Sequence, residues 1–295
     1  MVNTTSAETR PLVSVRGATS HTLPAASQGA DRRGVLRYLK AGSGAPLVLL
    51  HTVRTQAEHF RELIPLVAGD YTVHALDLPG MGHSEIVPGA GYEEADLRAG
   101  VKRLITELDL RDVTIVGESM GAVLALTTAG DLPDRVRRVV AVNLYDFDGG
   151  IKRANFLARF VVTGVLAPGV GGVFARLENK LVLRGILKGG LVDKSALRED
   201  YVDELNASGS RPGYWRVARE VFRNLPSLIA ARRRYAEVRA PVDLVYGAED
   251  WSRSSDREAN REVFPRATFT EVPDAGHFIA LERPDVIAEV LRPKG

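Results

Sequence analysis

A five-residue motif, Gly117-Glu118-Ser119-Met120-Gly121, constrains the fold of this chain more than any other feature. It follows an apolar run at residues 113–116 and precedes a helix-forming run at residues 122–126. This order predicts a strand, a tight turn and a helix, because glycines on either side of the apex leave room for the backbone. The serine at the apex is a candidate nucleophile. A serine that only caps the helix would give the same pattern, so other parts of the sequence must decide.

Short apolar runs alternate with helical patterns along most of the chain. Strands are predicted near residues 34–39, 46–50, 71–78, 113–116, 138–143, 242–246 and 267–272, and helices near residues 56–67, 93–108 and 284–291. Buried parallel strands are continuous apolar runs, and helices connect them across both faces of the sheet. The sequence therefore predicts an α/β fold, a mainly parallel doubly wound sheet of about eight strands.

The alternation stops between residues 148 and 238, where helical spacing replaces the strand-like runs. We expect residues 31–147 and 239–295 to form the core and residues 148–238 to form an inserted helical lid. The insertion leaves after one strand and returns before the next, so it should lie at the carboxyl edge of the sheet, where open sheets bind ligands. A helical layer that only adds stability is the alternative. Residues 1–30 are expected to be a flexible N-terminal arm with an early edge strand near residues 21–26.

Composition excludes several classes of protein. The 295 residues include 39 basic and 37 acidic ones, a formal net charge of +2, so no strong field for nucleic acid or an anionic membrane is expected. The chain has no cysteine, and its six histidines lack the spacing of metal ligands. Its longest uncharged stretch, residues 160–175, is shorter than the ~20 residues of a membrane span, and residues 1–20 lack the pattern of a secretory signal. We therefore expect no metal, no nucleic-acid partner, no membrane span, a cytoplasmic location and a small-molecule substrate; the sequence does not indicate an oligomeric state.

A serine hydroxyl needs a base to take its proton and a carboxylate to orient that base. Both residue types follow strands in this sequence. Asp250 lies in the loop after the strand that ends at Tyr246, and His277 follows the last predicted strand. The chain order Ser119, Asp250, His277 is the order found with strand-turn-helix serine motifs.

Four segments resemble those of the α/β-hydrolase superfamily, in the order that its fold requires. They are DLPGMGHS at residues 77–84, GESMG at 117–121, YGAED at 246–250 and AGHF at 275–278, within a resemblance that covers residues 34–293. Within the superfamily the chain looks most like small lidded esterases, C–C bond hydrolases and cofactor-free haloperoxidases. The resemblance implies Ser119 as nucleophile, His277 as base, Asp250 as acid and no cofactor.

The loop after the third strand departs from the superfamily pattern. Such enzymes usually have His-Gly there, whereas this chain has His51-Thr52-Val53-Arg54. The resemblance implies that the backbone N–H groups of Val53 and Met120 form the oxyanion hole. Because a β-branched residue restricts the backbone, the sequence leaves open whether Thr52 in place of the usual glycine alters the oxyanion hole.

Further residues near these motifs are candidates for lesser roles. Asp146 follows a strand at a place where some members of the fold carry their acid, so it is the reserve for Asp250. His51 and His83 are expected to fix loops by hydrogen bonding. The candidate substrate contacts are Arg54, Phe156, Trp215 and Phe278. Arg54 would select an acidic substrate, or it is an arginine that faces solvent. The three aromatic residues would contact a hydrophobic group of the substrate, or they belong to the core.

The leading hypothesis is a serine hydrolase that cleaves a carboxylic ester or thioester of a small hydrophobic substrate through an acyl-enzyme. The resemblance implies that dehalogenases and epoxide hydrolases of this fold carry aspartate at the apex, which argues against their chemistry here. One alternative is a hydrolase of C–C bonds in ring-cleavage products, which uses the same triad. Another is a ligand-binding protein with little turnover.

Overall fold

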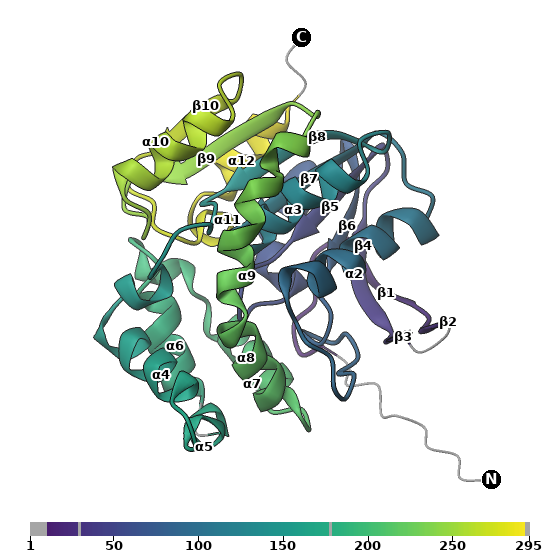
Figure 1. The fold of residues 1–295 in the computed structure, drawn as a ribbon. Coiled ribbons are helices and arrows are strands. Elements are labelled where there is room, and N and C mark those ends of the chain that lie inside the picture. Colours follow the sequence, from purple (N-terminus) through teal and green to yellow (C-terminus); the bar gives the residue numbers. More distant parts are fainter. Residues whose placement is uncertain (1–10, 29–30, 177–178, 293–295) are drawn as a thin grey trace, which may run out of the picture.

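The computed structural model of the chain describes residues 11–28, 31–176 and 179–292. Its main sheet has the strand order β1-β4-β6-β5-β7-β8-β9-β10 (Figure 1). The strands of this sheet are β1 (Ala18–Leu23), β4 (Leu36–Ala41), β5 (Ala45–Leu50), β6 (Tyr71–Leu76), β7 (Val113–Glu118), β8 (Val136–Val142), β9 (Val242–Gly247) and β10 (Thr268–Val272). Strands β2 (Ala26–Gln28) and β3 (Asp31–Arg33) pair with each other in a separate antiparallel sheet.

The sheet is mainly parallel, as the sequence predicts. Only the pairs β1–β4 and β4–β6 run antiparallel, and every other neighbouring pair in the main sheet is parallel. Alternate residues of the central strand β5 feed two separate cores: Val48 and Leu50 enter the core on one face, and Leu47 and Leu49 the core on the other. Successive side chains of a strand point to opposite faces, so a strand buried on both sides reads as an unbroken apolar run.

Helices cover both faces of the sheet (Figure 1). Residues of α2 (Glu94–Glu107) and α3 (Met120–Asp131) join one core, and residues of α1 (Ile64–Val67), α11 (Ile279–Glu282) and α12 (Pro284–Leu291) join the other. The helix α10 (Ser254–Val263) connects β9 to β10. The expected α/β architecture with a doubly wound sheet is therefore confirmed.

Between β8 and β9 the described part of the chain contains helices and no strand. These helices are η2 (Ile151–Arg153), α4 (Phe156–Leu166), α5 (Gly171–Arg176), α6 (Lys180–Lys188), η3 (Lys194–Ala196), α7 (Glu199–Gly209), α8 (Tyr214–Arg223), α9 (Leu225–Ala230) and η4 (Ala231–Glu237). They gather on one side of the sheet (Figure 1). Leu183, Leu187 and Tyr201 of this segment share a hydrophobic cluster with Phe278 of the core. We call residues 148–238 the inserted segment; its action as a lid stays a proposal.

Two predictions about local structure need correction. The helix expected at residues 56–67 is broken into η1 (Ala57–Phe60) and α1, because Pro65 lacks an N–H and is tolerated only in the first turn of a helix. The early strand lies at Ala18–Leu23 and not at residues 21–26, and it forms the edge of the main sheet, so this part of the predicted arm belongs to the core. Residues 1–10 and 29–30 of that arm lie outside the described residues.

Over the described ranges, no helix combines the length and the apolar character that crossing a membrane requires.

Candidate active site

Ser119 occupies a sharp turn between β7 and α3. Its backbone has φ 59° and ψ −117°, and its N–H donates to the carbonyl of Val142 at 2.8 Å. The flanking glycines are required by close backbone contacts: a Cβ on Gly117 would lie 2.1 Å from the carbonyl oxygen of Gly121, and a Cβ on Gly121 would lie 2.1 Å from that of Leu50. A positive φ at a residue with a side chain is strained and persists only where the surrounding structure holds it. The turn therefore presents the serine side chain at the carboxyl end of β7.

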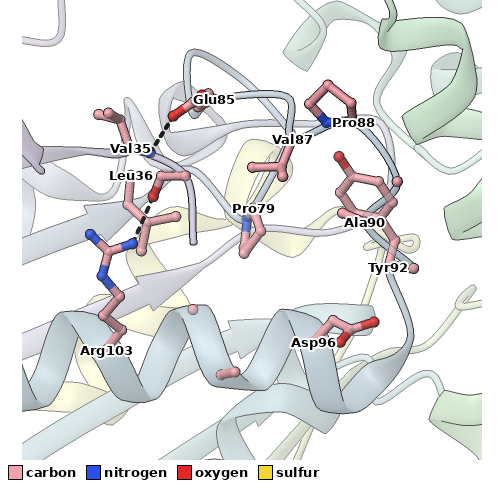
Figure 2. A pocket seen from close by; sticks show the side chains of 16 residues that line it. Val35, Leu36, Pro79, Glu85, Val87, Pro88, Ala90, Tyr92, Asp96 and Arg103 are labelled. Carbon is pink, nitrogen blue, oxygen red and sulfur yellow. Dashed lines mark hydrogen bonds between the residues drawn. The ribbon is translucent and has the colours of Figure 1, made fainter. Parts of the chain in front are cut away.

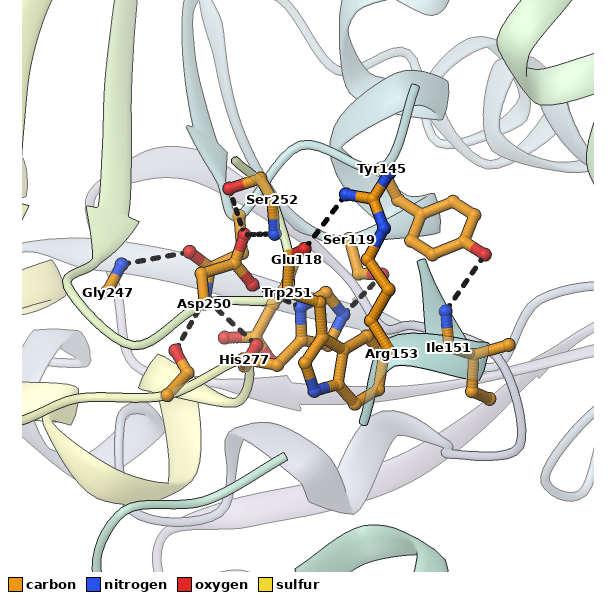
Figure 3. A network of polar contacts seen from close by, with 12 residues as sticks. Glu118, Ser119, Tyr145, Ile151, Arg153, Gly247, Asp250, Trp251, Ser252 and His277 are labelled. Carbon is orange, nitrogen blue, oxygen red and sulfur yellow. Dashed lines mark hydrogen bonds and ion pairs between the residues drawn. The ribbon is translucent and has the colours of Figure 1, made fainter. Parts of the chain in front are cut away.

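His277 joins Ser119 to Asp250 (Figure 3). Its Nε2 lies 2.9 Å from the Ser119 hydroxyl oxygen, and its Nδ1 lies 2.5 Å from Oδ1 of Asp250. An ionised carboxylate only accepts, so Nδ1 carries the ring proton and Nε2 is left to accept from the serine. All three side chains are buried. The structure thus brings together the three residues that the sequence selected for the triad.

Two hydrogen bonds from Ser252 fix the second oxygen of Asp250. The Ser252 N–H donates to Oδ2 at 2.9 Å, and its hydroxyl donates to the same oxygen. Burial alone would raise the pKa of Asp250, but the neighbouring His277 and the bonds from Ser252 outweigh it and lower that pKa. Asp250 therefore stays ionised and points its free oxygen at His277.

Two further residues hold the histidine, and neither was among the residues selected from the sequence. The ring of Trp251 stacks on the His277 ring with centroids 3.7 Å apart and an 11° angle between the planes (Figure 3). Asn143, at the end of β8, donates to the carbonyls of Gly276 and His277, both at 2.9 Å. Signals for both existed: Trp251 directly follows the predicted acid, and Asn143 is a polar residue at the carboxyl end of a buried strand.

The loop after β5 lies opposite the serine. His51 donates from Nδ1 to the Thr52 carbonyl at 2.8 Å and accepts at Nε2 from the Leu78 N–H at 3.0 Å. Burial lowers the pKa of His51 to about 4, so the ring is neutral and holds the loop, as expected. The residue with a left-handed backbone is Arg54, at φ 61°, and not Thr52, which stands in the place of the usual glycine. The unusual backbone conformation of this loop is therefore at Arg54, two residues after the position that differs from the superfamily pattern.

A narrow cavity of about 30 Å³ lies between this loop and the inserted segment. Ser119, Val53 and Arg54 line it together with apolar side chains, among them Leu187, Phe222 and Phe278. In this measure one water molecule needs about 10–15 Å³, so the cavity has room for two or three waters at most. As it stands, the cavity is therefore too small to hold an ester substrate beside Ser119.

Three of the candidate residues lie outside this cavity. Phe156 is 83 % exposed on α4, where its helix turns this side chain to solvent, so the geometry does not support the predicted contact with substrate. Trp215 lines a neighbouring cavity instead. Asp146 is buried against other partners, 2.8 Å from Arg232 and 3.0 Å from Asn260, so the geometry does not support it as the reserve acid.

Glu118, the residue before the nucleophile, is buried and hydrogen-bonded on both oxygens. It accepts from the Ala280 N–H at 2.9 Å, three residues beyond His277, and from Nε2 of His59. Nδ1 of His59 lies 3.2 Å from the hydroxyl of Tyr201 on α7. This buried chain of hydrogen bonds connects the serine turn, the histidine loop and the inserted segment, and no sequence motif indicates it.

A larger cavity of about 390 Å³ lies away from the triad, between the loop after β6 and helix α2 (Figure 2). Its polar groups make structural bonds: Arg103 donates to the Gly34 carbonyl at 2.6 Å, and Glu85 accepts from the Val35 N–H at 2.8 Å. None of the residues described in its wall belongs to the triad. Size alone therefore does not select the catalytic cavity.

Comparison with known proteins agrees with the fold. The family model described as "Alpha/beta hydrolase family" matches residues 47–290. The chain therefore belongs to the alpha/beta hydrolase family.

The relatives include hydrolases of several kinds. An uncharacterized hydrolase of Bacillus subtilis is 27 % identical over 82 % of this chain and 87 % of its own length. Haloalkane dehalogenase 2 of Mycobacterium tuberculosis is 25 % identical over 88 % of this chain and 91 % of its own length. The crystal structure of a haloalkane dehalogenase from Bradyrhizobium elkani superposes with a TM-score of 0.78 at 20 % identity, covering 93 % of this chain and 96 % of that one. At this identity the solved structure shows the fold alone. Hydrolase is the class of activity that these comparisons support.

Proposed function

We propose that this protein is a serine hydrolase that cleaves a carboxylic ester, or the thioester of the same acyl group, of a small hydrophobic substrate. The observation that carries the proposal is the hydrogen-bonded chain from Ser119 through His277 to Asp250, with distances of 2.9 Å and 2.5 Å. The distance from Ser119 to His277 lies within the range that proton transfer from a nucleophile to its base requires, and the hydrogen bond from His277 to Asp250 orients that base.

The reaction proceeds in two halves. Ser119 Oγ attacks the carbonyl carbon while Nε2 of His277 takes its proton, and Asp250 stabilises the imidazolium that forms. His277 then gives this proton to the leaving alcohol or thiol, which leaves an acyl group on Ser119. Water attacks the acyl carbon with the same histidine as base, and the carboxylic acid and free serine are released. No proton is gained or lost by the enzyme over the cycle.

The N–H groups of Met120 and Val53 are proposed to stabilise the oxyanion. Met120 is the first residue of α3, where N–H groups have no partner within the helix, and Val53 lines the cavity of Ser119. Among the hydrogen bonds of the described residues, none outside α3 uses either N–H. Both donors therefore remain for an oxygen that develops negative charge.

The nucleophile itself supports acyl transfer over the reaction named for the dehalogenase relatives. A serine that displaces halide from an alkyl carbon, or that opens an epoxide, forms an ether. The ether has no carbonyl carbon for water to attack, so the enzyme would be trapped after one turnover. An acyl-serine has such a carbon, and water releases it. Ser119 therefore favours substrates with a carbonyl group.

Hydrolysis of a C–C bond next to a carbonyl in a ring-cleavage product is the second candidate. It uses the same three residues, and the observation in its favour is Arg54, whose charge lines the cavity of Ser119 and suits a substrate carboxylate. A ligand-binding protein with little turnover is the non-enzymatic alternative.

Assays with four substrate classes separate these proposals. We expect hydrolysis of p-nitrophenyl esters of short acids, and no halide release from haloalkanes or diol formation from epoxides. Ser119→Ala should lower the rate by about 10⁶-fold, as loss of the serine does in another hydrolase triad. Cleavage of a vinylogous diketone acid in preference to any ester would favour the C–C hydrolase. Ester turnover that survives Ser119→Ala would refute the mechanism.

A further inference from the structure

The indole ring of Trp251 lies flat against the imidazole ring of His277. The two ring centroids are 3.7 Å apart and the planes differ by 11°, which is a face-to-face contact (Figure 3). Trp251 directly follows Asp250 in sequence and also lines the cavity of Ser119. The proton transfers of the proposed reaction give this contact no role.

The stack supplies a restraint that the hydrogen bonds of His277 do not. Bonds to the nitrogens of an imidazole lie near the plane of the ring, and the one to Ser119 is temporary. Once Ser119 is acylated it has no proton to donate, so only the bond to Asp250 remains of the two. A flat ring against the face of the imidazole opposes its tilt out of this plane in the acyl-enzyme.

The stack also favours the charged form of His277 that each proton transfer produces. A cation over the face of a tryptophan ring is attracted by the negative charge of the π electrons, and the attraction grows where water is excluded. His277 is buried, so the imidazolium forms in such a place. Its stabilisation beside Trp251 lowers the barrier in both halves of the reaction, because the charge is present in the transition state and absent before it.

The inserted segment holds both rings through the turn that follows α6. Nε1 of Trp251 donates to the carbonyl of Gly189 at 3.4 Å, and the N–H of His277 donates to the carbonyl of Gly190 at 2.6 Å. Two successive carbonyls of the inserted segment therefore contact the histidine and the ring stacked on it.

Two glycines make this close approach possible. A Cβ on Gly190 would lie 2.5 Å from Cε2 of Phe278 and 2.9 Å from Cζ2 of Trp251. From the other side, a Cβ on Gly276 would lie 2.4 Å from the carbonyl oxygen of Gly190. The turn and the histidine loop therefore pack this closely because neither carries a side chain at the contact.

We propose that Trp251 is a positioning residue for His277, and that the Gly189-Gly190 turn of the inserted segment holds the Trp251 ring in place. The inference rests on the proposed function, because it concerns the base of that reaction. Trp251 acts through His277 and takes no proton itself. The inserted segment thus supports the base in addition to forming part of the cavity wall.

Two replacements of Trp251 separate this role from simple filling of space. Trp251→Leu keeps an apolar side chain and removes the aromatic face, so kcat for p-nitrophenyl acetate should fall about 10- to 30-fold with KM unchanged, the effect of losing a desolvated cation–π contact. Trp251→Phe keeps an aromatic face and should stay within about threefold of wild type. Equal losses in the two variants, a loss in KM alone, or wild-type kcat in Trp251→Leu would overturn the positioning role and leave the serine hydrolase intact.

Glycine replacements test the part played by the turn. Gly190→Ala places a Cβ against Trp251 and Phe278, and the displaced ring should lower kcat about 10-fold or more. Gly185→Ala is the matched control, because its Cβ would meet Cδ2 of Leu157 at 2.7 Å on α6, away from the histidine loop, and its kcat should stay at the wild-type value. Neither glycine has a positive φ, so both backbones accept alanine. Equal kcat values in the two variants would overturn the role of the turn.

A spectroscopic measurement decides the proposal if no ester is hydrolysed. The chain has six histidines, so in protein with ¹³C-labelled histidine the ring signals of His277 are identified by their loss in His277→Gln. Protons over the face of an indole ring are shifted upfield, so Trp251→Leu and Gly190→Ala should move the His277 signals downfield, and Gly185→Ala should not. Unchanged signals in Trp251→Leu would refute the stack.

Labelling of Ser119 by an organophosphonate gives the matching rate without a substrate. We expect it to slow about 10-fold or more in Trp251→Leu, since the reaction also produces the imidazolium. Slowed labelling in a protein that hydrolyses no ester would refute the proposed function and retain the positioning role. Labelling at the wild-type rate in Trp251→Leu would refute the positioning role.

Discussion

Replacing Asp250 by asparagine tests the triad at the atom that orients His277. In the structure Oδ2 of Asp250 accepts two hydrogen bonds from Ser252, and Oδ1 faces Nδ1 of His277 at 2.5 Å. An asparagine has one accepting oxygen and one donating amide group. The two donor groups of Ser252 require an acceptor, so they bind the oxygen of the asparagine side chain. The amide NH₂ group of Asp250→Asn therefore faces Nδ1 of His277.

This rearrangement places the ring proton of His277 on the wrong nitrogen. Nδ1 must accept from the amide, so the ring proton moves to Nε2, which lies 2.9 Å from the Ser119 hydroxyl. In that tautomer Nε2 donates to the serine and does not take its proton. The same substitution in a serine-protease triad lowers kcat about 10⁴-fold for this reason, or about 5 kcal/mol of transition-state stabilisation.

The assay compares kcat/KM of Asp250→Asn and Asp146→Asn on a p-nitrophenyl ester. Asp146 is the matched control, because it is also a buried aspartate at the end of a strand but contacts Arg232 and Asn260. Asp146→Asn should cost stability, about 1–3 kcal/mol, and less than tenfold in rate for the protein that remains folded. Circular dichroism and thermal melting check that both variants fold. Asp250→Asn within tenfold of wild type, or a larger loss in Asp146→Asn, would refute the assignment.

Three further perturbations test the surroundings of the site. Burial lowers the pKa of His51 to about 4, whereas a histidine in the unfolded chain has a pKa of about 6.5, so the unfolded chain binds a proton first as the pH falls. The contribution of His51 to the free energy of unfolding is therefore complete above pH 6.5 and is lost between pH 6.5 and 4, about 3 kcal/mol in all. Urea titrations at several pH values should show that His51→Gln lacks this part of the pH dependence. Glu204→Gln should lower the free energy of unfolding, measured by urea titration, by about 1–3 kcal/mol, because the buried carboxylate accepts from two backbone N–H groups and two side chains. Asp203→Asn, at a half-exposed position on the same helix, is the control and should have a smaller effect. Leu187→Ala should widen the cavity beside Ser119 and shift the preferred acyl chain of p-nitrophenyl esters to greater length. Leu205→Ala, at a position buried outside that cavity, should leave this preference unchanged. An unchanged chain-length profile in Leu187→Ala would contradict the assigned cavity wall.

The order of elements could be predicted because buried parallel strands leave a direct trace in sequence. Strand β7, for example, is buried at every position and reads as an apolar run that ends at the serine motif. The triad was within reach for a related reason. Ser119, Asp250 and His277 each follow a strand, and parallel strands bring their carboxyl ends to one edge of the sheet.

Contacts between distant loops left no such trace. The two bonds from Ser252 to Asp250 and the chain from Glu118 through His59 to Tyr201 depend on how side chains far apart in sequence, or turned by a loop, meet in space. In the loop after β5 the branched side chain of Thr52 drew attention to position 52, yet the residue with a left-handed backbone is Arg54. Local residue type does not fix which position of a short loop carries the turn.

The inserted segment was the hardest to predict residue by residue. Its helix α4 carries apolar side chains on several sides, so Phe156 and Val162 look equivalent in sequence, although one is 83 % exposed and the other is buried. Trp215 was predicted near the substrate and lines a neighbouring cavity, not the one that Ser119 lines. The position of a short amphipathic helix on its partners depends on tertiary packing, which a sequence pattern does not contain.

Labelling with an organophosphonate tests the central claim, that Ser119 is an activated nucleophile, without knowledge of the natural substrate. The reagent phosphonylates serines whose proton is removed by a neighbouring base, so we expect one label per chain, on the peptide that contains Ser119, and loss of hydrolysis in proportion to labelling. His277→Ala should slow the labelling greatly, because the hydroxyl then lacks its base. No label on Ser119 in the folded wild-type protein, or labelling that proceeds equally well without His277, would contradict the account.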